Sequence, residues 1–219
     1  SLLKLAIPKG RLEEKVMTYL KKTGVIFERE SSILREGKDI VCFMVRPFDV
    51  PTYLVHGVAD IGFCGTDVLL EKETSLIQPF FIPTNISRMV LAGPKGRGIP
   101  EGEKRIATKF PNVTQRYCES KGWHCRIIPL KGSVELAPIA GLSDLIVDIT
   151  ETGRTLKENN LEILDEIFVI RTHVVVNPVS YRTKREEVVS FLEKLQEVIE
   201  HDSNEQSRGE GGSHHHHHH

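Results

Sequence analysis

The sequence is poor in cysteine, has no excess of charge and contains no long apolar run. Its four cysteines form no C-x-x-C pair and mostly lie in apolar stretches, as buried free thiols do. The formal net charge is -1, from 29 basic and 30 acidic residues, which argues against broad binding to nucleic acid or membranes. No stretch approaches a membrane span, and the N-terminus does not read as a signal peptide. These absences predict a soluble protein of a reducing compartment, the cytoplasm.

Histidine is abundant only at the end of the chain. Six of the ten histidines, His214–His219, follow Gly-Gly-Ser and are typical of a purification tag, so we exclude them. The other four show no metal-ligand spacing, and the sequence therefore predicts no metal site built from protein side chains. The polar composition of residues 204–219, tag included, predicts a disordered tail.

Short apolar runs alternate with amphipathic stretches along the 219 residues, a length that suits one large domain or two small ones. This alternation predicts a doubly wound α/β fold. Residues Gly93–Pro100 interrupt it with three glycines and two prolines, a composition typical of a linker or hinge. Separate strands are expected over 74–82 and 86–91 before this segment, and over 161–170 and 171–176 after it.

The hinge implies two lobes. The first comprises residues 1–92 plus 172–203, because the β-prone runs that end near 176 carry the chain back across the hinge. An amphipathic helix over 183–201 is expected to pack on this discontinuous lobe. The second lobe comprises residues 93–171.

Two stretches share one plan, Gly57–Phe63 (GVADIGF) and Gly141–Val147 (GLSDLIV). Each reads glycine, apolar residue, small residue, aspartate and apolar strand, and each leads into a turn with threonine and an acid. The match indicates two lobes of similar architecture, although a match this short is also compatible with coincidence.

The strand Leu145–Ile149 leads into the polar run Thr150–Thr155 and then into a helical turn. The four backbone N–H groups of Thr152–Thr155 can converge on a phosphate, and Gly153 lets it come close. An acid on the strand and another in the turn suit sugar hydroxyls, so the pattern predicts a sugar-phosphate site. An ordinary β-turn-α connection with Thr152 as helix N-cap remains an equal alternative. The residues assigned to this site are Asp148, Glu151, Thr152, Gly153, Arg154 and Thr155.

Three basic residues follow strands in the expected first lobe. Lys9 and Arg11 lie in the glycine turn after strand 3–7, and Arg46 follows strand 39–45. Ligands bind at the carboxyl ends of strands in open α/β sheets, so these cations could hold a polyphosphate. A solvated basic turn is the alternative.

Five segments in one order carry a resemblance to a known family. They read IPKGRL (Ile7–Leu12), VADIGFCGTD (Val58–Asp67), RIATKFPN (Arg105–Asn112), LKGSVELAPIAGLSD (Leu130–Asp144) and IVDITETGRTLKENNL (Ile146–Leu161). Over about residues 3–200 the chain resembles the catalytic subunit of ATP phosphoribosyltransferase. The resemblance implies a two-lobed α/β fold like the type II periplasmic binding proteins, with the ligand cleft between the lobes.

The resemblance also implies an activity. The family joins N1 of the ATP adenine to C1 of 5-phosphoribosyl 1-diphosphate (PRPP) and releases pyrophosphate in a Mg²⁺-dependent step, the first of histidine biosynthesis. The family's PRPP loop falls on Asp148–Thr155. Phosphoribosyltransferases usually have two adjacent acids there, whereas Ile149 follows Asp148 here. Asp148 and Glu151 are therefore both candidates for holding the ribose hydroxyls.

The same resemblance suggests roles for single residues. Lys9, Arg11 and Arg46 are candidates for the pyrophosphate and the ATP phosphates, and Arg154 for flanking the 5-phosphate. In the second lobe Glu135 and Lys109 are candidates for lining the cleft, with a solvent-facing position as the alternative for each. Mg²⁺ is expected to arrive with the substrate.

The chain ends after helix 183–201, where long family members continue into a regulatory domain. The resemblance therefore implies the short form, which works with a regulatory subunit related to histidyl-tRNA synthetase, and which we expect to be a homodimer when alone. A competing interpretation is a non-catalytic two-lobed small-molecule binding module, either a solute receptor or an effector domain. The sequence shows neither a signal peptide nor a DNA-binding segment to favour it.

Overall fold

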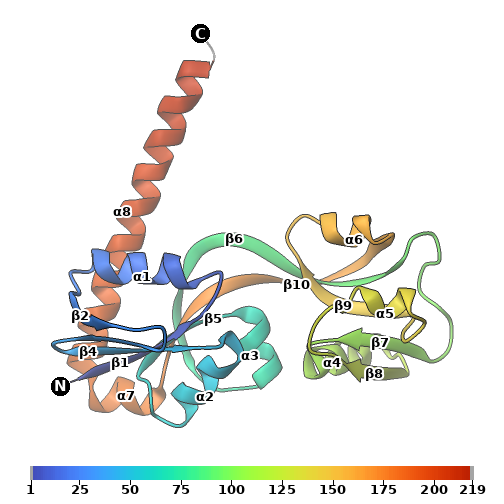
Figure 1. The fold of residues 1–219 in the computed structure, drawn as a ribbon, viewed down its shortest axis with the longest axis horizontal. Coiled ribbons are helices and arrows are strands. Elements are labelled where there is room, and N and C mark those ends of the chain that lie inside the picture. The colour runs from blue at the N-terminus through green and yellow to red at the C-terminus, as the bar shows by residue number, and fades with distance from the viewer. Residues whose placement is uncertain (1, 218–219) are drawn as a thin grey trace. The chain divides into compact units, whose positions relative to one another are not determined.

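The computed structural model describes residues 2–217, in which the chain divides into two compact units. Unit 1 comprises Ser1–Cys64, Ser75–Pro83 and His173–His219, and unit 2 comprises Gly65–Thr74 and Thr84–Thr172. Two long strands, β6 (Ile77–Pro94) and β10 (Leu161–Val176), contribute residues to both units (Figure 1). In residues 2–217 we find no helix long and apolar enough to span a bilayer.

Unit 1 is built on strands in the order β2-β3-β4-β1-β5, in which β1 lies parallel to both β4 and β5. The strands β2 and β3 form an antiparallel hairpin that the sequence pattern did not indicate, because their sequences FERE and LREG lack an apolar alternation. The elements of this unit are β1 (Leu3–Pro8), α1 (Glu13–Lys22), β2 (Phe27–Glu30), β3 (Leu34–Gly37), β4 (Ile40–Val45), the 3-10 helix η1 (Pro47–Asp49), α2 (Val50–Val55), β5 (Ile61–Gly65), α7 (Pro178–Thr183) and α8 (Arg185–His217).

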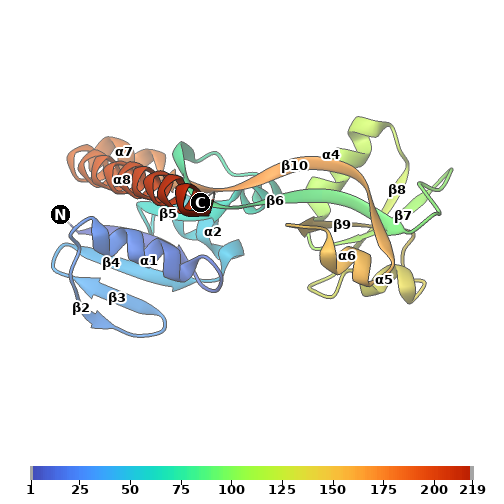
Figure 2. The same ribbon diagram turned by 90° about the horizontal axis from the view of Figure 1, so that it is seen from above.

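The core of unit 1 lies where α1 and α8 pack beside each other on the strands (Figure 2). Acidic residues in the first turn of α1 and lysines in its last turn complement the helix dipole. Its buried face includes Val16 and Leu20, which join Phe191 and Leu195 of α8 in one apolar cluster. The amphipathic helix expected over 183–201 therefore packs on the first unit, as the sequence predicts.

Asp60 links three elements of unit 1. It lies just before β5, is 3% exposed, and exchanges two hydrogen bonds with Lys4 of β1: its N–H donates to the Lys4 carbonyl at 2.7 Å, and its carboxylate accepts the Lys4 N–H at 2.9 Å. The same carboxylate accepts the Ser180 hydroxyl at 2.7 Å and the Lys184 ammonium at 3.1 Å. Because every oxygen of this buried carboxylate is paired, Asp60 stabilises the junction of β1, β5 and α7.

Unit 2 places its strands in the order β6-β9-β7-β8, with β10 beside β6. The strand β7 is parallel to β8 and β9, whereas β6 is antiparallel to β9. The remaining elements of this unit are α3 (Thr66–Lys72), β7 (Lys104–Thr108), α4 (Pro111–Lys121), β8 (Cys125–Pro129), α5 (Leu136–Ile139), β9 (Leu145–Thr150) and α6 (Arg154–Glu158).

A carboxylate from α3 caps the helix α4 of unit 2. Glu71 is 7% exposed, and its two oxygens accept the N–H groups of Asn112 and Val113 at 3.1 and 3.0 Å. The negative charge thus lies at the positive end of the α4 dipole and satisfies two of its first N–H groups. This pairing holds α3 against α4, although β6 and β7 lie between the two helices in the sequence.

The structure supports the internal repeat of the sequence. Asp144 precedes β9 as Asp60 precedes β5, and it exchanges the same two bonds with the neighbouring parallel strand: its N–H donates to the Arg105 carbonyl and its carboxylate accepts the Arg105 N–H, both at 2.9 Å. The Arg105 guanidinium also binds this carboxylate at 3.0 Å, and that pairing lowers the pKa of Asp144. The two units therefore share the local plan in which an aspartate clamps two parallel strands.

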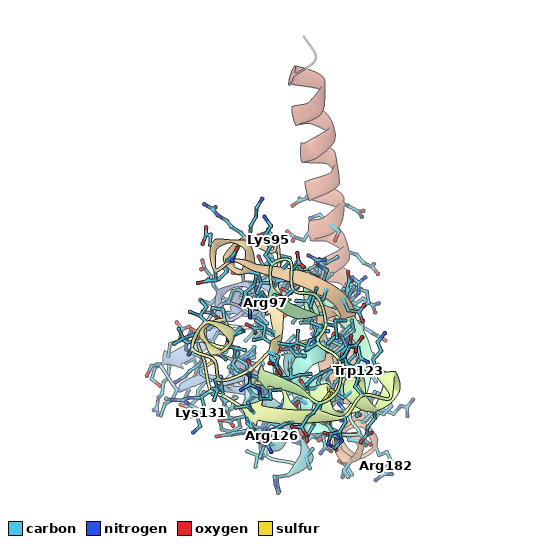
Figure 3. The ribbon with its side chains drawn as sticks, turned by 90° about the vertical axis from the view of Figure 1, so that its right-hand side faces the viewer. Lys95, Arg97, Trp123, Arg126, Lys131 and Arg182 are labelled. Atoms are coloured by element: carbon cyan, nitrogen blue, oxygen red, sulfur yellow. The ribbon has the colours of Figure 1, made fainter. Side chains whose placement is uncertain are left out.

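The hinge predicted over Gly93–Pro100 is wrong. This segment lies inside unit 2, where β6 ends and a turn with Gly96 at φ +83° and Gly98 at φ +66° leads toward β7. The Lys95 N–H donates to the Asn160 carbonyl at 3.0 Å, and the side chains of Lys95 and Arg97 in this turn are exposed (Figure 3). The glycines therefore serve a tight turn. Two of the crossings between the units occur within β6 and β10 instead.

Other predicted boundaries also differ from the structure. The predicted first lobe includes residues 65–74 and 84–92, which belong to unit 2. The two strands expected around Pro83 are one strand, because a proline is tolerated in a strand where its missing N–H is not needed. Residues 204–217 continue α8 where the sequence predicts a disordered tail. Extending a helix that already exists is easier than starting one, because each added residue forms one hydrogen bond.

Candidate functional site

The turn after β9 is closed by its own threonines. β9 ends at Thr150, Gly153 adopts φ +80° and ψ 0°, and α6 begins at Arg154. The Gly153 N–H donates to the Thr150 hydroxyl at 2.8 Å, and the Arg154 N–H donates to the Thr152 hydroxyl at 3.3 Å. Leu156 is buried and anchors α6 on the core of unit 2. The positive φ favours glycine at position 153, so the backbone conformation explains that residue.

This geometry bears on the alternative of an ordinary capped helix. The N-cap residue is Gly153 and has no side-chain cap, so Thr152 is not the helix N-cap. The helix that follows has only five residues, and the dipole available to an anion is correspondingly small. Two of the four N–H groups expected to face a phosphate donate to hydroxyls of the loop itself.

Asp148 and Glu151, the two candidate acids, have different surroundings. Asp148 is partly buried on β9, and burial raises its pKa; the N–H of Ile149, which donates to it at 2.8 Å, and the charge of Lys109 act in the opposite direction. The charge of Glu135 raises the pKa further. Glu151 is exposed. Lys109 and Glu135 are both partly buried, and the charges of both act on the pKa of Asp148.

Strand register explains how these groups meet. β7 and β9 are parallel neighbours in which Thr108 pairs with Val147, so the residues that follow, Lys109 and Asp148, lie at the same edge. Sequence analysis named both charged residues but missed the threonines beside them: Thr108 is fully buried and Thr150 is 8% exposed. A threonine at the end of a strand, next to a charged residue, was the available signal.

Strand register also places two basic residues of unit 1 at one edge of its sheet. β1 and β4 are parallel with Pro8 opposite Val45, and the Lys9 N–H donates to the Val45 carbonyl at 2.8 Å. Lys9 and Arg46 therefore follow two paired strand ends. Arg46 is exposed, and Arg11 is exposed in the turn that Gly10 forms at φ +95°.

The molecule is thus an α/β protein of two similarly built units, with charged groups at the carboxyl ends of parallel strands in each. This is the fold of the type II periplasmic binding proteins. The periplasmic aliphatic sulphonate binding protein SsuA from Escherichia coli matches it with a TM-score of 0.60 at 11% identity, over 95% of this chain and 76% of that one. At this identity the likeness concerns the fold alone.

Closer matches define the family. The family model HisG, ATP phosphoribosyltransferase, matches residues 46–197. An ATP phosphoribosyltransferase from Thermotoga petrophila is 95% identical over 207 residues, which are 94% of this chain and 100% of the relative. A chain of the ATP phosphoribosyl transferase (HisG:HisZ) complex from Thermotoga maritima is 99% identical with a TM-score of 0.89, over 91% of this chain and 100% of that chain. The chain belongs to the ATP phosphoribosyltransferase family.

Proposed function

We propose that this chain transfers the 5-phosphoribosyl group of PRPP to N1 of ATP, giving N1-(5-phospho-β-D-ribosyl)-ATP and pyrophosphate in the first step of histidine biosynthesis. The observation that carries the proposal is the glycine loop between β9 and α6, in a chain that belongs to this family. A phosphate-accepting loop beside a partly buried acid suits a sugar phosphate.

In this proposal the loop holds the 5-phosphate. The N–H groups of Gly153 and Arg154 point to the hydroxyls of Thr150 and Thr152, and phosphate oxygens would replace those hydroxyls as acceptors of the same donors. These two N–H groups therefore have hydrogen-bond partners before the ligand arrives. Phosphate binding exchanges one acceptor for another and leaves neither N–H group unpaired. Thr155 adds a hydroxyl, and the exposed Arg154 guanidinium, paired with Glu158 at 3.1 Å, is free to exchange that surface partner for phosphate.

Asp148 is assigned to the ribose hydroxyls in preference to Glu151. Its carboxyl is held by the Ile149 N–H and by the nearby charge of Lys109, whereas Glu151 is exposed. An acid whose orientation is set by its own protein can position the sugar for attack at C1. Glu135, whose charge reaches Asp148, belongs to the same side of unit 2.

The reaction requires stabilisation of a leaving group more than a base. The N1 lone pair of adenine forms the bond to C1 while the C1–O bond breaks, and pyrophosphate leaves with the bonding electrons. N1 carries no proton that must first be removed. Cations that bind the departing phosphates lower the barrier by electrostatic stabilisation, and Lys9, Arg11 and Arg46 are assigned to the pyrophosphate and the ATP phosphates.

Mg²⁺ fits this site as a companion of the substrate. Within residues 2–217 there is no group of three or more His, Cys, Asp or Glu side chains that could hold a metal ion. Diphosphate oxygens are the hard ligands that Mg²⁺ prefers, and the ion would supply charge neutralisation of the leaving group.

Two further assignments belong to the proposal. A regulatory partner of the HisZ kind is supported by the 99% identical chain, which was solved in a HisG:HisZ complex. We infer that this partner is related to histidyl-tRNA synthetase, that the chain alone forms a homodimer, and that the protein works in the cytoplasm.

A direct assay tests the function. Pyrophosphate release should require the chain, ATP, PRPP and Mg²⁺ together, and the nucleotide product should carry the ribosyl group on N1. Release without ATP would indicate PRPP hydrolysis. Binding of both ligands without any release, in the presence of the HisZ-type partner as well, would overturn the proposal in favour of the non-catalytic binding module.

A further inference from the structure

We propose that Thr108 is a positioning residue, whose buried hydroxyl binds the backbone next to Lys109 and next to Asp148 and so fixes the lysine beside the acid assigned to the ribose. The inference concerns a contact within unit 2. It rests on the proposed function in one respect only, the assignment of Asp148 to the ribose hydroxyls.

The Thr108 hydroxyl makes two hydrogen bonds in opposite directions. Its Oγ1 donates to the Val147 carbonyl at 2.8 Å and accepts the Phe110 N–H at 2.9 Å. Val147 immediately precedes Asp148 and Phe110 immediately follows Lys109, so one hydroxyl binds the backbone beside both charged residues. Because the donor and the acceptor capacity of the hydroxyl are each used, rotation of the Thr108 side chain would break both contacts.

Burial makes this connection rigid. Thr108 is 0% exposed and Phe110 is 1% exposed, so the backbone of Lys109 is held between two immobile neighbours. The Thr108 carbonyl also accepts the Leu130 N–H at 2.9 Å, which ties the same residue to the segment after β8. Water does not compete for these bonds, and their loss would leave buried polar groups unpaired.

The repeat between the two units shows that the equivalent strand of unit 1 folds without a hydroxyl at the position of Thr108. Lys4 of β1 corresponds to Arg105 of β7, since each exchanges the same bonds with an aspartate. Counting along the strands, Thr108 corresponds to Ile7, which is likewise 0% exposed. Unit 2 therefore has a buried polar group where unit 1 has an apolar one, and such a group calls for a specific role.

The charges around Asp148 supply that role. Lys109 follows β7 and its charge favours the ionised carboxylate, whereas Glu135 at the start of α5 acts in the opposite direction. On the other side, β6 places the uncharged Val90 opposite Asp148. Burial raises the pKa of Asp148, so the lysine offsets part of the burial effect and needs a defined position to do so.

The test measures the Asp148 pKa by carboxyl-carbon NMR of labelled protein, with Asp148→Asn to identify the resonance. Thr108→Val removes both hydrogen bonds at nearly constant volume and is expected to raise the Asp148 pKa further, as is Lys109→Met. In the Lys109→Met background, Thr108→Val should add no further shift, because the charge that it positions is gone. Thr108→Ser keeps the hydroxyl and should restore the pKa of the unaltered chain.

Thr114→Val is the matched control. Thr114 is also 0% exposed, and its hydroxyl donates to the carbonyl of the same Phe110 at 2.8 Å, but Thr114 lies on α4 and its hydroxyl is bonded within that turn of the chain. This variant should lose stability and leave the Asp148 pKa unchanged. If Thr108→Val does not fold, Thr108→Ala makes the same comparison with a smaller side chain.

Kinetics add an independent readout. Thr108→Val should raise KM for PRPP about tenfold, which is the effect of losing roughly one hydrogen bond between Asp148 and PRPP. KM for ATP should stay within about twofold of the unaltered chain. An unchanged Asp148 pKa in folded Thr108→Val or Thr108→Ala would overturn the inference whatever the activity. If the pKa responds as expected but Asp148→Asn leaves PRPP affinity intact, the positioning stands and the ribose assignment of Asp148 fails.

Discussion

Individual threonine hydroxyls and one glycine determine the backbone conformation of the loop between β9 and α6. Thr150 holds the N–H of Gly153, and Thr108 holds the backbone beside Lys109. Both threonines close strands at the edge where the charged groups gather. In the proposed function, the site therefore depends on residues that never need to touch the substrate, as well as on those that do.

Gly153→Val and Thr155→Val are expected to abolish or strongly weaken PRPP binding while the protein stays folded. A Cβ at Gly153 would lie 3.5 Å from Ile163, which is ordinary contact, so the cost comes from the φ of +80° and changes the loop itself. Calorimetric titration with PRPP measures the effect.

Gly122→Val is the control for backbone strain, because Gly122 has φ +69° at the end of α4, far along the chain from the loop. It should lower stability and preserve PRPP affinity. Equal affinity in all of these variants would remove the loop assignment.

Lys9→Ala and Arg46→Ala are expected to weaken the handling of ATP or pyrophosphate. A lost charge-assisted contact is worth about 1.5–3 kcal/mol, so each change should cost about 10- to 100-fold in binding or rate. Steady-state kinetics with ATP and PRPP varied separately would show which substrate is affected.

Arg97→Ala serves as the comparison, since Arg97 is an exposed arginine of the turn after β6 (Figure 3). It should leave the kinetics unchanged. Rates within twofold of the parent for both Lys9→Ala and Arg46→Ala would return these residues to the alternative of a solvated basic turn.

Pairs of elements are joined by a few buried polar contacts added to apolar packing. Asp60 ties β1 to β5 and α7, Glu71 ties α3 to α4, and Tyr19 ties α1 to α8. In each case the groups are far apart in sequence. The apolar faces determine that two elements pack, and the polar contact determines their alignment.

The α1–α8 contact predicts a loss of stability in alkali. Burial and a hydrogen bond of 3.1 Å from the Tyr19 hydroxyl to Asp202 raise the pKa of Tyr19 from 10 to about 12. A raised folded-state pKa stabilises the protein fully below pH 10, and this contribution is lost as the pH rises from 10 toward 12. Denaturant unfolding between these pH values should therefore show falling stability.

Tyr19→Phe should flatten that dependence, because no phenol remains to ionise at this junction. Tyr53→Phe, on α2, is the control and should keep the slope of the parent protein. An unchanged slope in Tyr19→Phe would mean that other groups cause the alkaline loss.

At the scale of the whole molecule, each unit presents charged residues at the carboxyl ends of its parallel strands. The cations of unit 1 are assigned to the pyrophosphate and ATP, and the loop of unit 2 to the ribose phosphate. The family model and the relatives match residues of both units.

We expect this chain alone to have low activity that histidine barely inhibits, and the HisZ-type partner to raise the activity and confer inhibition. The reason is that an effector acts only by binding one state of a protein more tightly than another, and the partner supplies such a differential interaction. Steady-state assays with and without the partner, each over a range of histidine, make the comparison. Strong inhibition of the isolated chain would locate the effector site here.

The local structure that carries the candidate site could be predicted from sequence because its signals are local. A strand, a glycine turn and a helix start are recognisable from neighbouring residues alone, and this was enough to indicate the loop after β9 and the cations after β1 and β4. The aspartates before β5 and β9 were also visible as a short repeat. The roles of Thr108 and Thr150 were not predicted, because a threonine that ends a strand does not show in the sequence which backbone groups its hydroxyl binds.

The sequence by itself determined the alternation of strands and helices and the family, since apolar periodicity and motif order survive in one dimension. Only the tertiary structure decided where the chain passes between units. Gly93–Pro100 has the composition of a hinge and forms a turn, whereas β6 continues through Pro83. Strand continuity and the surroundings of Asp148 depend on pairing with residues distant in sequence, and composition carries no information about those partners.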